Sequence, residues 1–195
     1  MTLRSVCLFC GSASGASPAY LNAARAFGRE LARQGVTLVY GGGNIGLMGA
    51  AADAALEAGG QVIGVIPEFL KAREVAHLGL TQLHVTQSMH ERKALMAELS
   101  DAFVALPGGF GTLDELFEIV TWAQLSVHAK PIGLLDVEGF FQPLLQMVRH
   151  MAEQGFIRPA HLELFCQADD VPTLLTRIED YRPVTASKWL GLDRT

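Results

Sequence analysis

Two short motifs carry the residues best suited to chemistry on a charged small molecule. The first, residues 106–115, runs from a predicted strand through three glycines into a predicted helix. Glycines let a ligand approach the backbone, and the free N–H groups and dipole of a helix start favour an anion such as phosphate. A purely structural interpretation is also open. Thr112 and Glu115 have the spacing of a capping box, in which two side chains accept hydrogen bonds from the unpaired backbone N–H groups at a helix start. Glu118 and Trp122 continue the helix face of Glu115 and either line a site or are simply buried.

The second motif, residues 89–96, begins a predicted helix just before the strand that leads to the first motif. Arg92 and Lys93 are adjacent there, so their side chains point about 100° apart on a helix and we expect that they are not both buried. One interpretation is a solvated charge run. The other is that Arg92 faces a cleft as a contact for a phosphate or a leaving group.

A further glycine-rich loop, residues 41–46, matches the G-x-G-x-x-G pattern of dinucleotide-binding proteins. It follows the second predicted strand rather than the first, and the usual acidic partner is met only loosely by Glu68. Three interpretations stay open: tight turns with close helix packing, NAD binding with redox chemistry, and a wall that shapes a nucleotide site.

These motifs are embedded in an alternation of short apolar runs and longer helical patterns. Strands are predicted at 6–9, 37–40, 62–66, 83–85, 102–106, 132–135 and 164–166, and helices at 18–34, 47–58, 90–99, 113–125, 141–153 and 171–181. Nearly all-apolar strands that alternate with helices indicate a parallel sheet buried on both faces. The sequence therefore predicts a single Rossmann-like domain over residues 1–195, a doubly wound α/β fold with helices on both faces. From about residue 182 the pattern weakens into a tail that we expect to pack through Trp189.

In such a fold, ligands bind beyond the carboxyl ends of the strands, where the strand order reverses. Three glycine-rich loops follow predicted strands, at residues 10–15, 41–46 and 107–112. We expect all three to converge at one edge of the sheet and to form the site.

Composition excludes several classes of protein. The formal net charge of −5 argues against a nucleic-acid binder, which needs a basic surface to neutralise phosphates. No apolar run approaches the roughly 18 residues of a membrane helix, so we expect no membrane partner. An apolar content of 50% is high for a small monomer and hints at an oligomer. Three cysteines give no secreted-type disulfide framework, which favours a cytoplasmic protein.

Metal and thiol chemistry find little support in the spacing of histidines and cysteines. The six histidines contain no i, i+4 pair, so no metal site is predicted and they are expected to be surface or capping residues. Cys7 and Cys10 end a strand at an odd spacing, which places their thiols on opposite faces of the sheet.

Taken together, the motifs at 10–15, 41–49, 89–96 and 107–118 resemble those of the LOG (lonely guy) family. Its members are cytokinin riboside 5′-monophosphate phosphoribohydrolases, often labelled lysine decarboxylase-like. The resemblance runs from about residue 5 to residue 159. Its most specific part is the Arg92-Lys93 pair followed by the glycine-rich motif, in which Phe110 occupies the variable position.

The resemblance implies hydrolysis of the N-glycosidic bond of an adenosine 5′-monophosphate, with or without an N6 substituent, to free base and ribose 5-phosphate. It implies Arg92 and Glu115 as the catalytic pair and no cofactor. Substrate contacts would come from a wider set, and the resemblance implies a homodimer. That set is Glu74, Lys93, Gly108, Gly109, Gly111, Thr112 and Thr121, with Glu68 competing for the role of Glu74.

The implied chemistry suits these residue types. Glycoside cleavage passes through an oxocarbenium-like state that a carboxylate can stabilise or that activated water can attack. Arg92 could stabilise the departing base. Two alternatives to a cytokinin-specific enzyme stay open: an AMP nucleosidase-like enzyme without N6 preference, and a non-catalytic nucleotide-binding module.

Overall fold

The computed structural model describes residues 3–71 and 76–184. Within these ranges the chain forms a seven-stranded sheet whose neighbouring strands are all parallel. The strands are β1 (Ser5–Phe9), β2 (Thr37–Tyr40), β3 (Val62–Pro67), β4 (Gln82–Thr86), β5 (Ala102–Ala105), β6 (Ile132–Leu135) and β7 (Cys166–Ala168). Their order in the sheet is β4-β3-β2-β1-β5-β6-β7. This arrangement confirms the predicted doubly wound fold.

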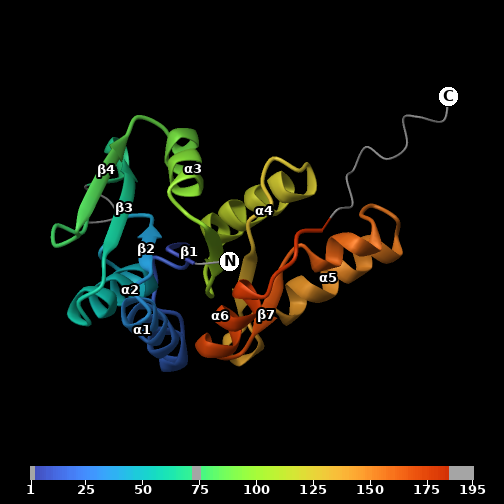
Figure 1. The fold of residues 1–195 in the computed structure, drawn as a ribbon, viewed down its shortest axis with the longest axis horizontal. Coiled ribbons are helices and arrows are strands. Elements are labelled where there is room, and N and C mark those ends of the chain that lie inside the picture. The colour runs from blue at the N-terminus through green and yellow to red at the C-terminus, as the bar shows by residue number, and fades with distance from the viewer. Residues whose placement is uncertain (1–2, 72–75, 185–195) are drawn as a thin grey trace.

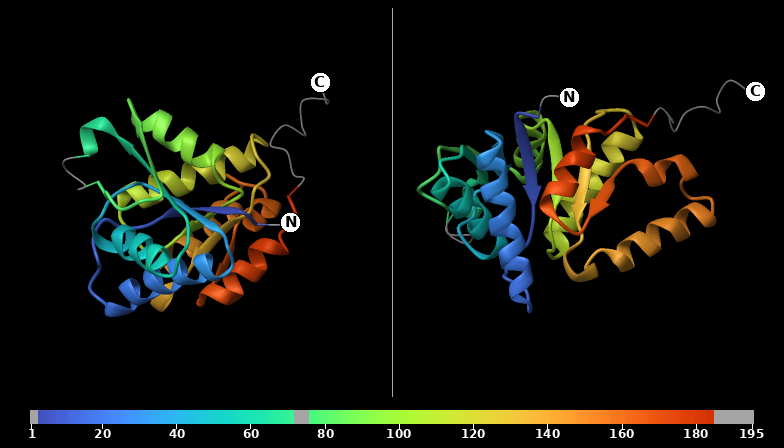
Figure 2. Two further views of the ribbon diagram at one scale, coloured as in Figure 1. Left: turned by 60° about the vertical axis from the view of Figure 1, so that its left-hand side comes forward. Right: turned by 60° about the horizontal axis from the view of Figure 1, so that its bottom comes forward.

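In the described part of the chain, six α-helices cover the two faces of the sheet (Figures 1 and 2). They are α1 (Pro18–Arg33), α2 (Gly46–Glu57), α3 (Met89–Glu98), α4 (Phe110–Gln124), α5 (Gln142–Glu153) and α6 (Val171–Glu179). Buried side chains of α1, α2 and α6 form one core with the sheet, and those of α3, α4 and α5 form a second core on the opposite face. The central strands β5 and β6 are buried throughout, as parallel strands between two helical layers must be.

Several helices begin at the signals that the sequence offers. The side chain of Ser17 accepts a hydrogen bond from the backbone of Ala19 ahead of Pro18, the first residue of α1. Ser88 caps α3 in the same way through the backbone N–H of Glu91, and Asp170 caps α6. These caps fix where the helices start and therefore which residues of α3 face the sheet.

The chain reverses direction in the sheet between β1 and β5. From β1 it winds outward through β2 and β3 to β4, and it then crosses back to β5 on the other side of β1. The loops that follow β1 and β5 therefore diverge at the switch point, which is where this class of sheet binds its ligands.

Three expectations need correction. The last strand lies at Cys166–Ala168 instead of residues 164–166, since a 3-10 helix occupies Pro159–Glu163 just before it. The α4 helix begins at Phe110, three residues earlier than predicted. The histidines are not uniformly at the surface, because His77 and His161 are buried in contact with other polar groups.

Two expectations fall outside the described residues, namely Glu74 as a substrate contact and the tail that contains Trp189. None of the helices in residues 3–71 and 76–184 combines the length and the apolar composition needed to cross a membrane.

Candidate active site

The glycine-rich loops converge at the carboxyl edge of the sheet, as predicted. The backbone N–H of Gly11 donates to the carbonyl of Pro107 at 3.1 Å, which joins the first loop to the third. The N–H of Leu47 donates to the carbonyl of Gly11 at 3.0 Å, which joins the second loop to the first. Gly46, with a φ of +60°, sits where a β-carbon would overlap the backbone of Ser12. Close backbone packing of this kind accounts for that glycine without a dinucleotide.

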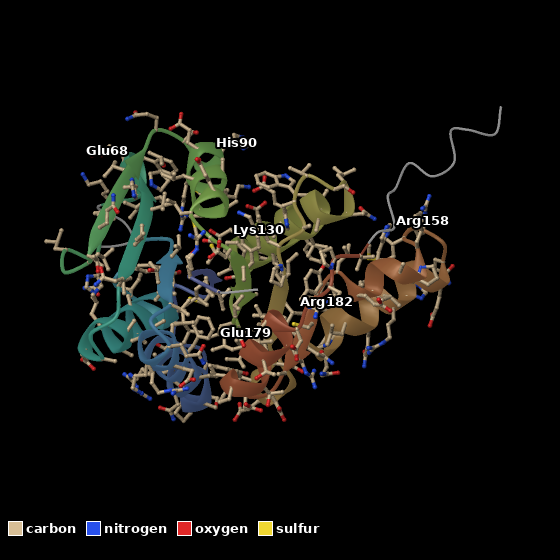
Figure 3. All side chains as sticks on the ribbon, in the orientation of Figure 1. Glu68, His90, Lys130, Arg158, Glu179 and Arg182 are labelled. Atoms are coloured by element: carbon tan, nitrogen blue, oxygen red, sulfur yellow. The ribbon has the colours of Figure 1, made fainter. Side chains whose placement is uncertain are left out.

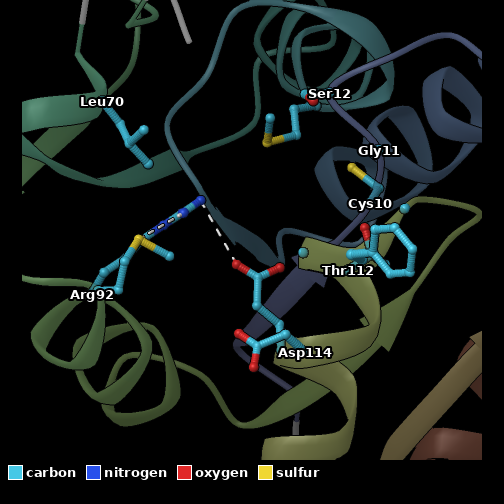
Figure 4. A pocket seen from close by; sticks show the side chains of 13 residues that line it. Cys10, Gly11, Ser12, Leu70, Arg92, Thr112 and Asp114 are labelled. Carbon is cyan, nitrogen blue, oxygen red and sulfur yellow. Dashed lines mark hydrogen bonds and ion pairs between the residues drawn. The ribbon is translucent and has the colours of Figure 1, made fainter. Parts of the chain in front are cut away.

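A pocket of about 280 Å³ opens beside these loops (Figure 4). One part of its lining is polar and includes Arg92 from α3 together with Glu115 and Asp114 from α4. The remaining lining residues are Cys10, Gly11, Ser12, Met48, Leu70, Met89, Gly109, Phe110, Gly111 and Thr112. The pocket thus combines a helix start without a side-chain cap, a cation, carboxylates and an apolar wall.

Arg92 is almost completely buried, with 5% of its surface exposed. Its Nε donates to the carbonyl of Val65 at 3.1 Å, and its Nη2 donates to the carbonyl of Gly41 at 3.3 Å. The Nη2 atom also lies 3.8 Å from Oε1 of Glu115, whose side chain is 11% exposed. The two carbonyls hold the guanidinium in one orientation, so the charge faces Glu115 and the pocket.

The glycine at position 41 is required by this arrangement. A β-carbon there would overlap the Nη2 atom of Arg92 and would approach Sδ of Met48 to 3.3 Å. Gly41, the first glycine of the G-x-G-x-x-G loop, therefore makes room for the guanidinium of Arg92. The sequence could not reveal this role, because Arg92 lies 51 residues further along the chain.

The start of α4 has no side-chain cap. Gly109 is its N-cap residue and Thr112 lies inside the first turn, so the capping-box interpretation of Thr112 and Glu115 is wrong. The first N–H groups of any helix have no partner within the helix, so those of α4 can bind an anion. Thr112 is buried against Gly108, where a β-carbon would overlap its Oγ1.

Lys93 is only partly buried, so the expectation that adjacent Arg92 and Lys93 are not both buried is confirmed. The exposed share of its side chain is 11%, because α4 packs against α3 and supplies carboxylates. Its Nζ lies 3.2 Å from Oδ2 of Asp114 and 3.0 Å from Oε2 of Glu118. The solvated-charge interpretation is therefore wrong for buried Arg92, whereas partly buried Lys93 pairs with carboxylates, and His90 and Glu91 are exposed.

Sequence reasoning missed the apolar wall of the pocket. Met48, Leu70 and Met89 line it from three different elements, and Sδ of Met89 lies 3.8 Å from Nη1 of Arg92. Met48 and Met89 lie within the motifs at residues 41–49 and 89–96, and this position was the one sequence signal that they could line the pocket. Leu70 belongs to a 3-10 helix after β3 that no periodicity marks.

Two cysteines lie close to the site, on opposite faces of the sheet as predicted. Burial, followed by the negative charge of Glu115, raises the pKa of Cys10, which lines the pocket. Burial likewise raises the pKa of Cys7 well above its usual value. Both groups are therefore neutral thiols near pH 7, and neither is suited to act as a thiolate nucleophile.

Two further residues proposed for substrate contact lie elsewhere. Thr121 does not line this pocket but a neighbouring, more open hollow along α4 that shares Phe110 and Asp114 with it, and the Oγ1 of Thr121 donates to the carbonyl of Phe117 at 2.6 Å. Glu68, the competitor of Glu74, is exposed after β3 and pairs with Lys71 at 3.3 Å (Figure 3). Glu68 does not belong to the lining of the pocket. In the described ranges no group of three or more His, Cys, Asp or Glu side chains could hold a metal ion.

Comparisons with known proteins agree with this geometry. A family model described as "Possible lysine decarboxylase" matches residues 48–178. A protein of Rhodococcoides fascians named cytokinin riboside 5′-monophosphate phosphoribohydrolase is 53% identical over 82% of this chain and 81% of its own length. The chain belongs to the LOG family. Another LOG protein, the cytokinin riboside 5′-monophosphate phosphoribohydrolase LOG3 of Arabidopsis thaliana, is 46% identical over 92% of this chain and 84% of its own length.

The LOG fold extends to more distant proteins. The molybdenum cofactor carrier protein of Chlamydomonas reinhardtii matches 91% of this chain and 97% of its own with a TM-score of 0.70. The two sequences are only 22% identical, so the likeness concerns the fold alone.

Proposed function

We propose that this protein hydrolyses the N-glycosidic bond of adenosine 5′-monophosphates that carry an N6 substituent, releasing the free base and ribose 5-phosphate. The observation that carries the proposal is the placement of Arg92 and Glu115, 3.8 Å apart, in a pocket that also contains the uncapped start of α4. The names of LOG relatives at 53% and 46% identity support the same activity.

The phosphate would bind at the start of α4. Gly109 and Gly111 line the pocket there, and no atom lies within 4 Å of the position that a β-carbon would take at either residue. Gly108 and Thr112 pack against each other beneath the turn and fix its shape. Exposed N–H groups at a helix start attract an anion through hydrogen bonds and through the helix dipole. Because the phosphate is remote from the bond that breaks, its binding energy would serve to orient the ribose.

Glu115 would then face the anomeric carbon. As the bond between that carbon and the base nitrogen breaks, its electron pair leaves with the base and positive charge develops on the ribose. The carboxylate of Glu115 would stabilise this charge and accept a proton from the attacking water, whose oxygen forms the new bond to carbon. Arg92, already positioned by two carbonyls, would stabilise the negative charge of the departing base, which takes up a proton from solvent to become the free base, while Glu115 returns the proton of the attacking water to solvent.

The decarboxylase description of the family model does not fit the pocket. A pyridoxal-dependent decarboxylase needs a lysine that forms a Schiff base with the cofactor. No lysine lines the pocket among the described residues. Lys71 and Lys93 are held by carboxylates, and Nζ of Lys130 donates to the carbonyl of Ala97 at 2.8 Å.

We also propose a homodimer and a cytoplasmic location. The outer side of α4 carries Phe110, 94% exposed, and Phe117, 39% exposed, next to the hollow that contains Thr121. A second copy that covers this face would remove apolar surface from water and would bring Thr121 into an interface. It could also complete the substrate contacts, including that of Glu74. Free Cys7, Cys10 and Cys166 favour a reducing compartment.

The proposal is tested by incubating the protein with AMP and with N6-isopentenyladenosine 5′-monophosphate and following base release by chromatography. The matched nucleosides without phosphate and an Arg92→Ala variant serve as controls. We expect release from the monophosphates only, faster with the isopentenyl substrate and lost in the variant. Equal rates would favour an AMP nucleosidase-like enzyme. Tight binding without any release would favour a nucleotide-binding module.

A further inference from the structure

The ion pairs of Lys93 lie beside the pocket instead of inside it. Its Nζ contacts Asp114 at 3.2 Å and Glu118 at 3.0 Å, and its side chain is 11% exposed. Of the residues that the structure describes, those lining the pocket include Asp114 but neither Lys93 nor Glu118. The ammonium group is therefore engaged by protein carboxylates at the contact between α3 and α4.

The partners of Lys93 flank the partner of Arg92. Arg92 and Lys93 are consecutive in α3, while Asp114 immediately precedes Glu115 in α4 and Glu118 follows it within one turn. Figure 4 shows the Asp114 side chain next to the carboxylate that the dashed line joins to Arg92. Three cation–carboxylate contacts, one from Arg92 and two from Lys93, thus connect the same two helices side by side. A change in the separation of the helices at Lys93 must change the separation of Arg92 from Glu115.

The charge state of Lys93 supports a permanent contact. Burial alone would lower the pKa of Lys93, but its hydrogen bonds with Glu118 and Asp114 outweigh burial and raise it above the usual value. Lys93 is therefore a cation throughout the pH range of an ordinary assay. It also offsets two negative charges next to a pocket that we propose to bind a phosphate.

We propose that Lys93 is a positioning residue, which ties α3 to α4 through Asp114 and Glu118 and so sets the distance between Arg92 and Glu115. This inference rests on the proposed function, in which that pair is catalytic. It differs from the substrate contact that the family resemblance implies for Lys93. A positioning residue changes the rate of the chemical step, whereas a substrate contact changes substrate affinity.

The test compares Lys93→Met, Lys93→Arg and Glu118→Gln in the base-release assay. We expect Lys93→Met to lower kcat about 100-fold, as a displacement near 1 Å in an active site does, with KM changed less than about threefold. Lys93→Arg keeps the charge and should restore kcat to within about tenfold of the original protein. As a single variant, Glu118→Gln should lower kcat. In the double variant with Lys93→Met it should lower kcat little further, because both substitutions remove the same contact.

A rise in KM at unchanged kcat, or an effect of Glu118→Gln that adds fully to that of Lys93→Met, would overturn the proposal. If Lys93→Met does not fold, Lys93→Arg and Glu118→Gln carry the same comparison of kcat with KM. Failure of the proposed function is a separate outcome, since the unmodified protein would then release no base. Crystal structures decide the inference in that case. A separation of Nη2 of Arg92 from Oε1 of Glu115 that lengthens in Lys93→Met, or in Glu118→Gln, supports it, and an unchanged separation contradicts it.

Discussion

Gly41 leaves no space between its α-carbon and the guanidinium of Arg92. Its carbonyl accepts a hydrogen bond from Nη2 of Arg92 at 3.3 Å, and a β-carbon at this position would overlap the same nitrogen. Because Arg92 is buried, the guanidinium cannot step aside into solvent. The glycine therefore fixes the position of the guanidinium at the end of β2, while the contact between α3 and α4 sets how far Glu115 lies from it.

Gly41→Ala should displace Arg92 and lower kcat about 100-fold, the usual cost of a misplaced catalytic group. The measurement is steady-state base release from the isopentenyl substrate. The matched control places Gly41→Ala in an Arg92→Lys background, where the Nη2 atom is already gone. If the alanine acts through Arg92, it has little further effect there. An equal loss in both backgrounds would mean that the alanine damages the fold instead.

Gly111→Ala should separate substrate binding from stability. A β-carbon at Gly111 meets no atom within 4 Å, and the residue lies in the first turn of α4. Alanine favours a helix over glycine by about 0.5–1 kcal/mol, so the melting temperature should stay level or rise. If a phosphate approaches this turn closely, affinity for AMP should fall about tenfold, or 1.4 kcal/mol. Calorimetric titration gives the affinity, and unchanged binding would place the phosphate elsewhere.

Cys10 should be chemically inert although it lines the pocket. Burial and the charge of Glu115 raise its pKa, so it does not form the thiolate that an ordinary cysteine forms as pH rises toward 9. Iodoacetamide at pH 8 should leave Cys10 unmodified in peptide mass spectra, and Cys10→Ala should keep kcat within about threefold. Rapid alkylation of Cys10 with loss of base release would show that a thiolate takes part.

His128 should make stability depend on pH. Partial burial of the ring beside Phe103 lowers the pKa of His128 below the usual 6.5, and this outweighs the hydrogen bond from Nε2 to the carbonyl of Ile119, which acts in the opposite direction. Just below pH 6.5 the unfolded chain therefore binds a proton at His128 more readily than the folded protein does. Proton binding then favours unfolding, so the melting temperature should fall as pH drops below 6.5. His128→Asn should flatten this decline, with the exposed His90→Asn as control. A slope unchanged in His128→Asn would assign the pH dependence to other groups.

The fold was predictable because its determinants are local. The apolar runs are short, and several end at glycine or proline, as at Gly41, Pro67 and Pro107. Strand positions were therefore correct to within about two residues, and parallel order followed from the alternation with helices. The start of α4 was misplaced because Thr112 imitates an N-cap, whereas the backbone turn at Gly109 begins the helix without any side chain.

The site was predictable only in part, for a physical reason. Arg92 and Glu115 were found from their motifs, and the structure brings them together. The angular separation of Arg92 and Lys93 on one helix predicted that they are not both buried, but the ion pairs of Lys93 depend on packing between helices and could not be foreseen. The carboxylates of these ion pairs come from α4, more than twenty residues away along the chain. Gly41 likewise acquires its role only when β2 is placed next to β3 beneath α3.

The most direct test of the account is base release by Glu115→Gln, measured in a single turnover with N6-isopentenyladenosine 5′-monophosphate. Glutamine keeps the shape of the side chain but cannot accept the proton of the attacking water. We predict a rate at least about 1,000-fold below that of the original protein, within the range for loss of a general base, with an unchanged melting temperature and bound substrate. Release at a nearly normal rate would contradict the catalytic role of Glu115 and, with it, the proposed mechanism.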